Sequence, residues 1–166
     1  TALNVDDTGS TVHKDGTLTA NTLTGLAMGD EGIQYSGVRK LNISLGTGRD
    51  HFYIDSTPDG TTTVLNTGDE PAVGNQITDI VNINSIAGST TINAGKGNDV
   101  IRVNYDIDGN QTFRNGIDPT APLTLHGNAG SDLYEIGLAG SGEGVSNIYV
   151  DDVSNDGRPN RLKIYG

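Results

Sequence analysis

Three segments of this sequence combine glycine and aspartate at a spacing suited to binding a metal ion. The pattern Gly-x-Gly-x-Asp occurs at residues 46–50 and 95–99, and a looser copy spans residues 127–132. Glycine allows backbone conformations that are closed to residues with a Cβ, so carbonyl oxygens can turn toward one point, where the aspartate adds a carboxylate. Ca²⁺ takes about 6–8 oxygen ligands of these two kinds. The pattern therefore predicts calcium sites at these turns.

The predicted ligands are the turn aspartates and the neighbouring glycines. They are Asp50, Asp79, Asp99, Asp132, Gly46, Gly48, Gly95 and Gly97. Two such turns, stacked on neighbouring coils of chain, would clamp one ion between them. The alternative is that each aspartate closes its own turn by accepting backbone N–H groups, with no ion involved.

Short strands must position these turns. Apolar residues alternate with polar ones before each turn, at residues 41–45, 90–94 and 123–126, and again after it. The turn aspartates are separated by 29, 20 and 33 residues, so one aspartate marks each coil and insertions at residues 70–78 and 106–122 explain the uneven spacing. Repetition of strand, glycine turn and strand is typical of a stacked coil.

We therefore predict an all-β fold, a right-handed parallel β-solenoid of the β-helix or β-roll kind with irregular loop insertions. The alternative is a β-sandwich, because turns at 8–12-residue spacing, which sandwiches show, are partly present. The predicted core consists of Leu41, Ile43, Phe52, Ile54, Val81, Ile83, Ile92, Ile101, Val103, Leu125, Ile148 and Val150.

A longer repeat is also visible. The segment at residues 3–7 (Leu-Asn-Val-Asp-Asp) matches residues 148–152 (Ile-Tyr-Val-Asp-Asp) at an offset of 145 residues. A chance match of five residues is the alternative. We expect residues 1–166 to be a single solenoid module, about one 145-residue period of a tandem array, with neighbouring repeats of the same chain as partners.

Composition limits the function classes. The net charge is −11, and 17 aspartates outnumber 4 glutamates, which argues against nucleic acid as a partner and favours cations. Only 33% of the residues are hydrophobic, which suits the narrow core stripe of a coil. No apolar stretch approaches the length of a membrane span, so no membrane insertion is expected. Cysteine is absent, which is compatible with a secreted bacterial protein.

Two resemblances follow from these residues. The turns around Asp50, Asp99 and Asp132 resemble the repeats-in-toxin (RTX) calcium-binding β-roll, which implies folding linked to Ca²⁺ in a secreted protein. Nearly the whole chain is similar to the tandem β-strand repeat proteins of bacteria, through phrases such as residues 23–28, 32–37, 61–68 and 121–127. This second resemblance implies a giant exported or cell-surface protein.

The expected function is structural, as an adhesin or stalk segment set rigid by Ca²⁺, outside the cell or at its surface, and without enzymatic activity. A carbohydrate-binding module is one alternative, since Tyr53 and Tyr134 are expected to stack outward as a ladder for glycans. A polysaccharide-active β-helix enzyme is the other, which would require His51 and His126, beside glycine turns in different coils, to approach each other.

Overall fold

The computed structural model describes most of the 166-residue chain, and every regular element in that part is a β-strand. The described residues are 1–70, 74, 76–104, 121–137, 147–152 and 156–165. The strands are β1 (Ala2–Asp6), β2 (Asp15–Leu18), β3 (Thr22–Gly25), β4 (Ile33–Gln34), β5 (Lys40–Ser44), β6 (His51–Ile54), β7 (Thr62–Asn66), β8 (Ile80–Ile83), β9 (Thr90–Asn93), β10 (Val100–Val103), β11 (Leu123–His126), β12 (Leu133–Gly137), β13 (Ile148–Val150) and β14 (Arg161–Tyr165). The all-β prediction is confirmed for the described residues, and no helix among them could cross a membrane.

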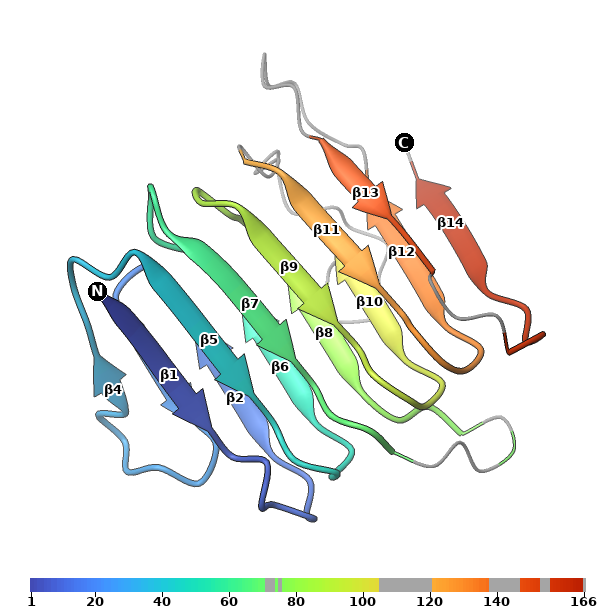
Figure 1. Ribbon diagram of the computed structural model, residues 1–166, viewed down its shortest axis with the longest axis horizontal. Helices are drawn as coiled ribbons and strands as arrows, with labels where there is room; N and C mark the ends of the chain where they lie inside the picture. Colours follow the sequence, from blue (N-terminus) through green and yellow to red (C-terminus); the bar gives the residue numbers. More distant parts are fainter. Residues whose placement is uncertain (71–73, 75, 105–120, 138–146, 153–155, 166) are drawn as a thin grey trace.

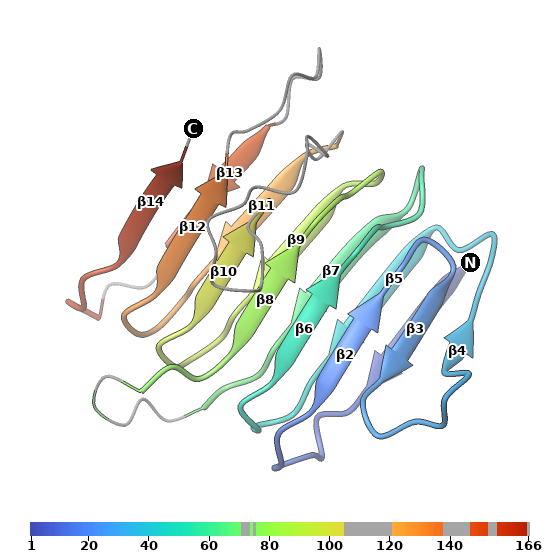
Figure 2. The same cartoon turned by 180° about the vertical axis from the view of Figure 1, so that it is seen from behind.

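The strands form two layered sheets (Figure 1). The six-stranded sheet has the order β1-β5-β7-β9-β11-β13, and the eight-stranded sheet has the order β14-β12-β10-β8-β6-β2-β3-β4. From β5 onward, consecutive strands alternate between the two sheets. We call each such pair of strands, and also β1 with β2, a rung. Figure 2 shows the eight-stranded sheet from its own side.

Neighbouring rungs pair in parallel and in register. In the six-stranded sheet Ile43 lies beside Leu65, and Leu65 lies beside Ile92. Among the described strands only β2–β3 and β3–β4 are antiparallel, and they form a hairpin extension at the edge of the first rung that the sequence pattern did not predict. The predicted insertion at residues 106–122 lies almost entirely outside the described residues.

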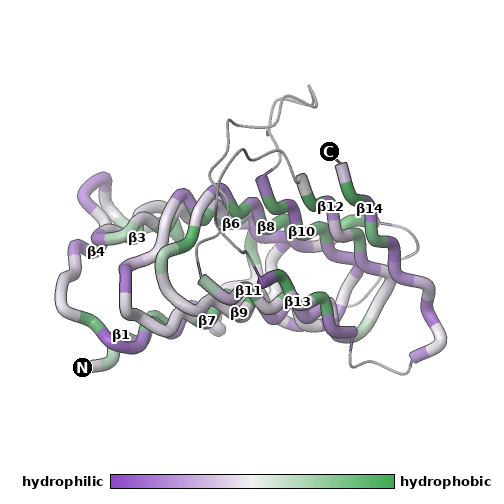
Figure 3. Tube along the Cα trace, turned by 90° about the horizontal axis from the view of Figure 1, so that it is seen from above, coloured by the Kyte–Doolittle hydropathy of each residue, from purple (hydrophilic) through white to green (hydrophobic). Residues whose placement is uncertain are grey.

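The core lies between the sheets because alternate residues of each strand point inward. Seen from above, the two layers both carry apolar stretches along their strands (Figure 3). Ten of the predicted core residues are buried: Leu41, Ile43, Phe52, Ile54, Val81, Ile83, Ile92, Ile101, Val103 and Leu125. The prediction was wrong for Ile148, which is partly buried, and for Val150, which is 36% exposed. Both lie in β13, the last strand of its sheet, so no described strand covers them.

The predicted outward ladder of tyrosines does not form, because the prediction was wrong for Tyr134. Tyr134 is only 2% exposed and occupies the inward register position of Phe52, Val81 and Ile101. Leu133 instead takes the outward position. In each rung the second residue after the turn aspartate points inward. Leu133 is the first residue after Asp132, and its apolar side chain led to the wrong prediction that it points inward.

Candidate functional site

The four turn aspartates come together as one buried column. Asp50, Asp79, Asp99 and Asp132 each lie directly before a strand of the eight-stranded sheet, in successive rungs. Their exposed fractions are 2%, 0%, 1% and 1%. The four residues therefore occupy equivalent positions in successive rungs, as their spacing predicted. We call these four residues the aspartate column.

One oxygen of each carboxylate accepts a hydrogen bond from the backbone of the neighbouring rung. The N–H of Asp50 donates to Asp79 Oδ1 at 2.7 Å, the N–H of Asp79 donates to Asp99 Oδ1 at 2.9 Å, and the N–H of Asp99 donates to Asp132 Oδ1 at 2.9 Å. Lys14 donates its N–H to Asp50 Oδ1 at one end of the column. The aspartates thus accept backbone N–H groups, as the alternative without an ion proposed, but from the adjacent rung and not from their own turns.

The second carboxylate oxygen lacks a partner in three of the four aspartates. Oδ2 of Asp79, Asp99 and Asp132 is buried without a hydrogen bond, and so are both carboxylate oxygens of Glu70, which is 3% exposed. Glu70, Asp79 and Asp99 each place a carboxylate oxygen within 4.8 Å of the others. We call these three residues the carboxylate cluster. Asp50 and Asp132 continue the column on either side but do not belong to the cluster.

Burial dominates the electrostatics of the cluster. Removal from water raises the pKa of Asp99 to about 8, above its ordinary value near 4, and the negative charge of Asp79 adds to this rise. Burial raises the pKa of Glu70, and the negative charge of the adjacent Asp79 carboxylate adds to this rise; burial also raises the pKa of Asp79. At neutral pH the cluster must therefore keep protons, bind a cation or tolerate repulsion between buried charges.

Glu70 was missed by the sequence analysis, which placed it in an insertion. The parallel bridges join Asp69 to Lys96 and Lys96 to Ala129, so Glu70 takes the register position that Gly97 and Gly130 hold in later rungs. Aligning the segment at residues 68–70 with the one at residues 95–97 would have revealed a carboxylate in the place of the second glycine of the motif.

The predicted glycine ligands have a structural role that requires no ion. A Cβ at Gly95 would lie 1.5 Å from the carbonyl oxygen of Gly68, and one at Gly97 would lie 2.1 Å from Thr78 Oγ1. Their φ angles of +84° and +141° also favour glycine. A Cβ at Gly46 or Gly48 would likewise clash with a backbone oxygen of the first rung's loop, at 2.0 and 2.3 Å. Close contact between successive turns thus accounts for glycine at all four positions.

The donor set of the carboxylate cluster fits Ca²⁺. Calcium takes oxygen ligands, and Glu70, Asp79 and Asp99 each offer one carboxylate oxygen within 4.8 Å of the others, close enough to share one ion. Without a cation or protons, the unpartnered oxygens of these residues would be buried charges that lack hydrogen-bond donors, which is a costly arrangement. Of the predicted aspartates, Asp79 and Asp99 are therefore the two that fit a shared site.

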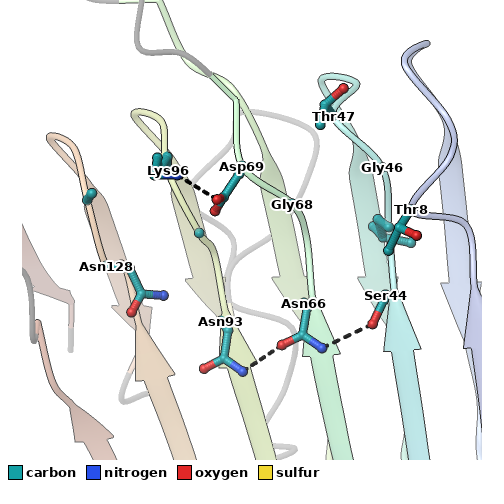
Figure 4. A pocket seen from close by; sticks show the side chains of 13 residues that line it. Thr8, Ser44, Gly46, Thr47, Asn66, Gly68, Asp69, Asn93, Lys96 and Asn128 are labelled. Atoms are coloured by element: carbon teal, nitrogen blue, oxygen red, sulfur yellow. Dashed lines mark hydrogen bonds and ion pairs between the residues drawn. The ribbon is translucent and has the colours of Figure 1, made fainter.

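A second column of polar side chains runs along the other side of the same turns (Figure 4). The side-chain amide of Asn93 donates to Asn66 Oδ1 at 2.8 Å, and that of Asn66 donates to Ser44 Oγ at 3.2 Å. We call these three residues the asparagine ladder. They line a groove of about 580 Å³, which also borders the exposed ion pair between Lys96 and Asp69 (Nζ to Oδ2, 2.7 Å).

The expected approach of His51 to His126 is not seen, because the two residues lie in different sheets, in β6 and β11. His51 instead packs against His13, with ring centroids 4.8 Å apart. His126 lies near Asp151, with 3.2 Å between its Nδ1 and the backbone oxygen of Asp151. The histidine pair that motivated the enzyme alternative is thus absent.

Comparison with known proteins adds no assignment to this geometry. The fold and the site therefore have to be interpreted from the residues themselves. No protein-family model, no curated protein and no solved structure matches this chain.

Proposed function

We propose that this chain is a structural and interaction module of a secreted or cell-surface repeat protein. In this proposal the rungs are the coils of a right-handed parallel β-solenoid, and further rungs stack on its end. A sandwich of antiparallel sheets fits poorly with the parallel register between rungs. An adhesin or stalk segment needs such stacking, because each added rung lengthens the module without a new core.

The observation that carries this proposal is the apolar face at the end of the stack. Leu162 and Ile164 of β14 are 52% and 58% exposed. They continue the inward register of Tyr134 and Ile136 in β12, which are 2% and 5% exposed. The last rung therefore presents core-type side chains to solvent, and another rung would bury them.

The sequence repeat supports the same proposal. Through successive strand pairs, Leu3 of β1 shares one register column with Ile148 of β13. In the other sheet, Leu18 of β2 shares a column with Ile164 of β14. The matching segments thus occupy equivalent positions in the first and last rungs, as expected of a tandem array with a period near 145 residues.

We propose that calcium stabilises the module at the carboxylate cluster. Glu70 and Asp79 lie in the connection between β7 and β8, and Asp99 lies in the next one, between β9 and β10, so a shared ion would link these two turns. When bound, Ca²⁺ would supply the positive charge that cancels repulsion among the three carboxylates. Because the unfolded chain does not assemble these ligands, binding would add to the free energy of unfolding.

A tandem chain tests the stacking. Residues 1–166 followed directly by a second copy of residues 21–166 keep the register, since residue 166 corresponds to residue 20. We expect one elongated particle in small-angle X-ray scattering and one thermal transition. At the junction, β14 of the first copy takes the place of β2 in the second copy. The edge of β2 that pairs with β3 is then already occupied by β12 of the first copy, so β3 of the second copy must leave the sheet.

Leu162→Asp provides the matched control for this experiment. In the single module Leu162 is exposed, so the substitution should change the free energy of unfolding by less than about 0.5 kcal/mol. In the tandem chain the same residue at the junction becomes buried, and the unpaired charge should cost about 2 kcal/mol or more. A tandem chain that tolerates Leu162→Asp, or that scatters as two independent particles, would contradict the stacking.

Glycan binding is a second candidate, favoured by the groove along the asparagine ladder. Side-chain amides and hydroxyls such as those of Asn66, Asn93 and Ser44 match the hydrogen-bonding groups of sugars. Titration with neutral oligosaccharides, followed through the side-chain amide signals of Asn66 and Asn93 by NMR, tests this candidate. Unchanged signals at millimolar oligosaccharide would exclude binding in this groove.

A further inference from the structure

A histidine and aspartate cluster lies on the surface of the first two rungs, apart from the carboxylate cluster. It consists of His13, Asp15 and His51, and one ligand-type atom of each residue lies within 4.8 Å of the others. Asp15 is the first residue of β2, and His51 is the first residue of β6. These two residues are direct partners in the parallel register, so the sheet itself places their side chains side by side.

The backbone around the cluster is well anchored. His51 donates its N–H to the carbonyl of Lys14 at 2.9 Å, and the N–H of Lys14 donates to the carboxylate of Asp50 at 2.8 Å. His13 lies immediately before this segment. The three side chains are therefore attached to backbone that the first two rungs hold in place, although His51 follows Asp15 by 36 residues in the sequence.

The tautomer of His13 suits a ligand. Its Nδ1 is hydrogen-bonded to the backbone carbonyl oxygen of Arg49, so in the neutral ring Nδ1 carries the proton and Nε2 has a free lone pair. A backbone carbonyl that accepts the second ring N–H is the usual outer-shell partner of a metal-bound histidine. This Nε2 faces Asp15, at 3.5 Å from Oδ2.

The spacing of the donor atoms also fits one ion. His51 Nδ1 lies 3.7 Å from Asp15 Oδ1, the other oxygen of the same carboxylate. Zinc bonds of about 2.0–2.2 Å in tetrahedral geometry separate neighbouring ligand atoms by about 3.4 Å. The distances from Asp15 to His13 Nε2 and to His51 Nδ1 are both longer than an ordinary hydrogen bond and close to the separation expected between two zinc ligands. Two imidazoles and one carboxylate are donors that suit Zn²⁺ and related transition metals better than Ca²⁺.

We propose that His13, Asp15 and His51 form a surface site for a divalent transition-metal ion of the Zn²⁺ class. Three protein ligands leave a fourth position for water or for a donor from a partner. Half-exposed side chains, with exposed fractions of 48% for His13, 65% for Asp15 and 36% for His51, give an ion direct access. Binding there would tie the first rung to the second.

Calorimetric titration of the tag-free, chelator-treated chain with ZnCl₂ tests the site. We expect one ion per chain, with binding that excess Ca²⁺ leaves unchanged. His13→Ala and His51→Ala should each weaken binding by roughly tenfold or more, because losing a ligand costs at least as much as losing an outer-shell partner. Because both histidine side chains are exposed, the two variants should unfold in EDTA at the same temperature as the unsubstituted chain. This measurement checks that they fold.

The third histidine supplies the matched control. His126→Ala removes a histidine from the other sheet and should leave zinc affinity unchanged, and so should Glu70→Gln in the carboxylate cluster. Replacing Zn²⁺ with Co²⁺ should give visible absorption bands, and these bands should be absent in the His51→Ala variant. The proposal is overturned if the chain binds no zinc, if His13→Ala and His51→Ala bind it as the unsubstituted chain does, or if Glu70→Gln abolishes binding.

Discussion

Two columns of polar side chains flank the same turns, and they differ in what they require. The asparagine ladder of Ser44, Asn66 and Asn93 is half-buried, and each amide donates to the next residue along. The aspartate column is buried, and its carboxylates accept from the backbone but donate nothing. An amide carries both donor and acceptor, so amides in successive rungs can bond to one another, whereas the carboxylates of Asp79, Asp99 and Asp132 each leave one oxygen unpaired.

This difference shows where the hydrogen bonds of the chain leave buried polar groups unpaired. The asparagine ladder is complete within the chain. The carboxylate cluster is not, because Glu70 adds a third negative group to Asp79 and Asp99, and their unpartnered oxygens need either protons or a cation. The dependence arises at the one rung where Glu70 replaces the usual glycine.

The largest effect should come from truncating the aspartate column. Asp99→Ala removes the acceptor of the Asp79 N–H and of the Thr78 hydroxyl, so two buried donors lose their partner. We expect a loss of about 3 kcal/mol in the free energy of unfolding, measured with urea in EDTA. Asn93→Ala, in the half-buried ladder, should cost about 0.5–1 kcal/mol, and exposed Asp59→Ala should cost almost nothing. Equal losses for Asp99→Ala and Asn93→Ala would remove the distinction between the columns.

The two columns should also differ in their response to pH. The unfolded aspartates titrate near pH 4, whereas burial raises the folded pKa of Asp99 to about 8. Between these values the folded chain binds more protons than the unfolded chain, so the free energy of unfolding falls as pH rises and levels off above the folded pKa. We expect a loss of about 2 kcal/mol from pH 5 to pH 7 in EDTA.

Asp99→Asn should flatten this pH profile, because the substitution removes a titrating group from the cluster. Asn93→Ala should leave the slope unchanged, since the asparagine ladder has no titrating group. The comparison is made by urea unfolding at several pH values with the chelator present. A rise in stability from pH 5 to pH 7 would show that the buried carboxylates are ionised and stabilised in some other way.

A smaller effect is expected from neutralising Glu70. Burial raises the pKa of Glu70 to about 9, so at pH 8 the folded chain keeps this carboxyl protonated although the unfolded chain ionises it. Glu70→Gln removes this cost, so at pH 8 in EDTA it should raise the free energy of unfolding by about 1 kcal/mol. Thermal unfolding with Glu31→Gln as an exposed control checks this prediction. Destabilisation by Glu70→Gln in EDTA would contradict this prediction, because it would mean that the folded chain stabilises the Glu70 carboxyl group without an ion.

The smallest effect should come from the exposed charges beside the asparagine ladder. Lys96→Ala breaks the ion pair with Asp69, but both side chains are more than half exposed. Exposed pairs contribute little, so we expect a change of about 0.5 kcal/mol or less in the free energy of unfolding. A larger loss of unfolding free energy would show that ion pairs on the groove side of the turns also stabilise the fold.

The sequence repeats predicted the buried residues of the rungs well, but they did not predict the features that depart from the repeat. The spacings of 29, 20 and 33 residues between turn aspartates correspond to successive hydrogen bonds of the column. Glu70 was not predicted, because one carboxylate in the place of a glycine is visible only when rungs are aligned by register. The β3–β4 hairpin was not predicted either, because its two short strands depend on pairing with β2 and carry no repeat signal of their own.

The central claim is that the carboxylate cluster is completed by calcium, and thermal unfolding at pH 7.5 tests it most directly. We predict that millimolar Ca²⁺ raises the melting temperature relative to EDTA, and that Glu70→Gln and Asp99→Asn lose most of this rise while Glu31→Gln keeps it. Equal melting curves in Ca²⁺ and EDTA, or a calcium effect that survives in both cluster variants, would contradict the claim.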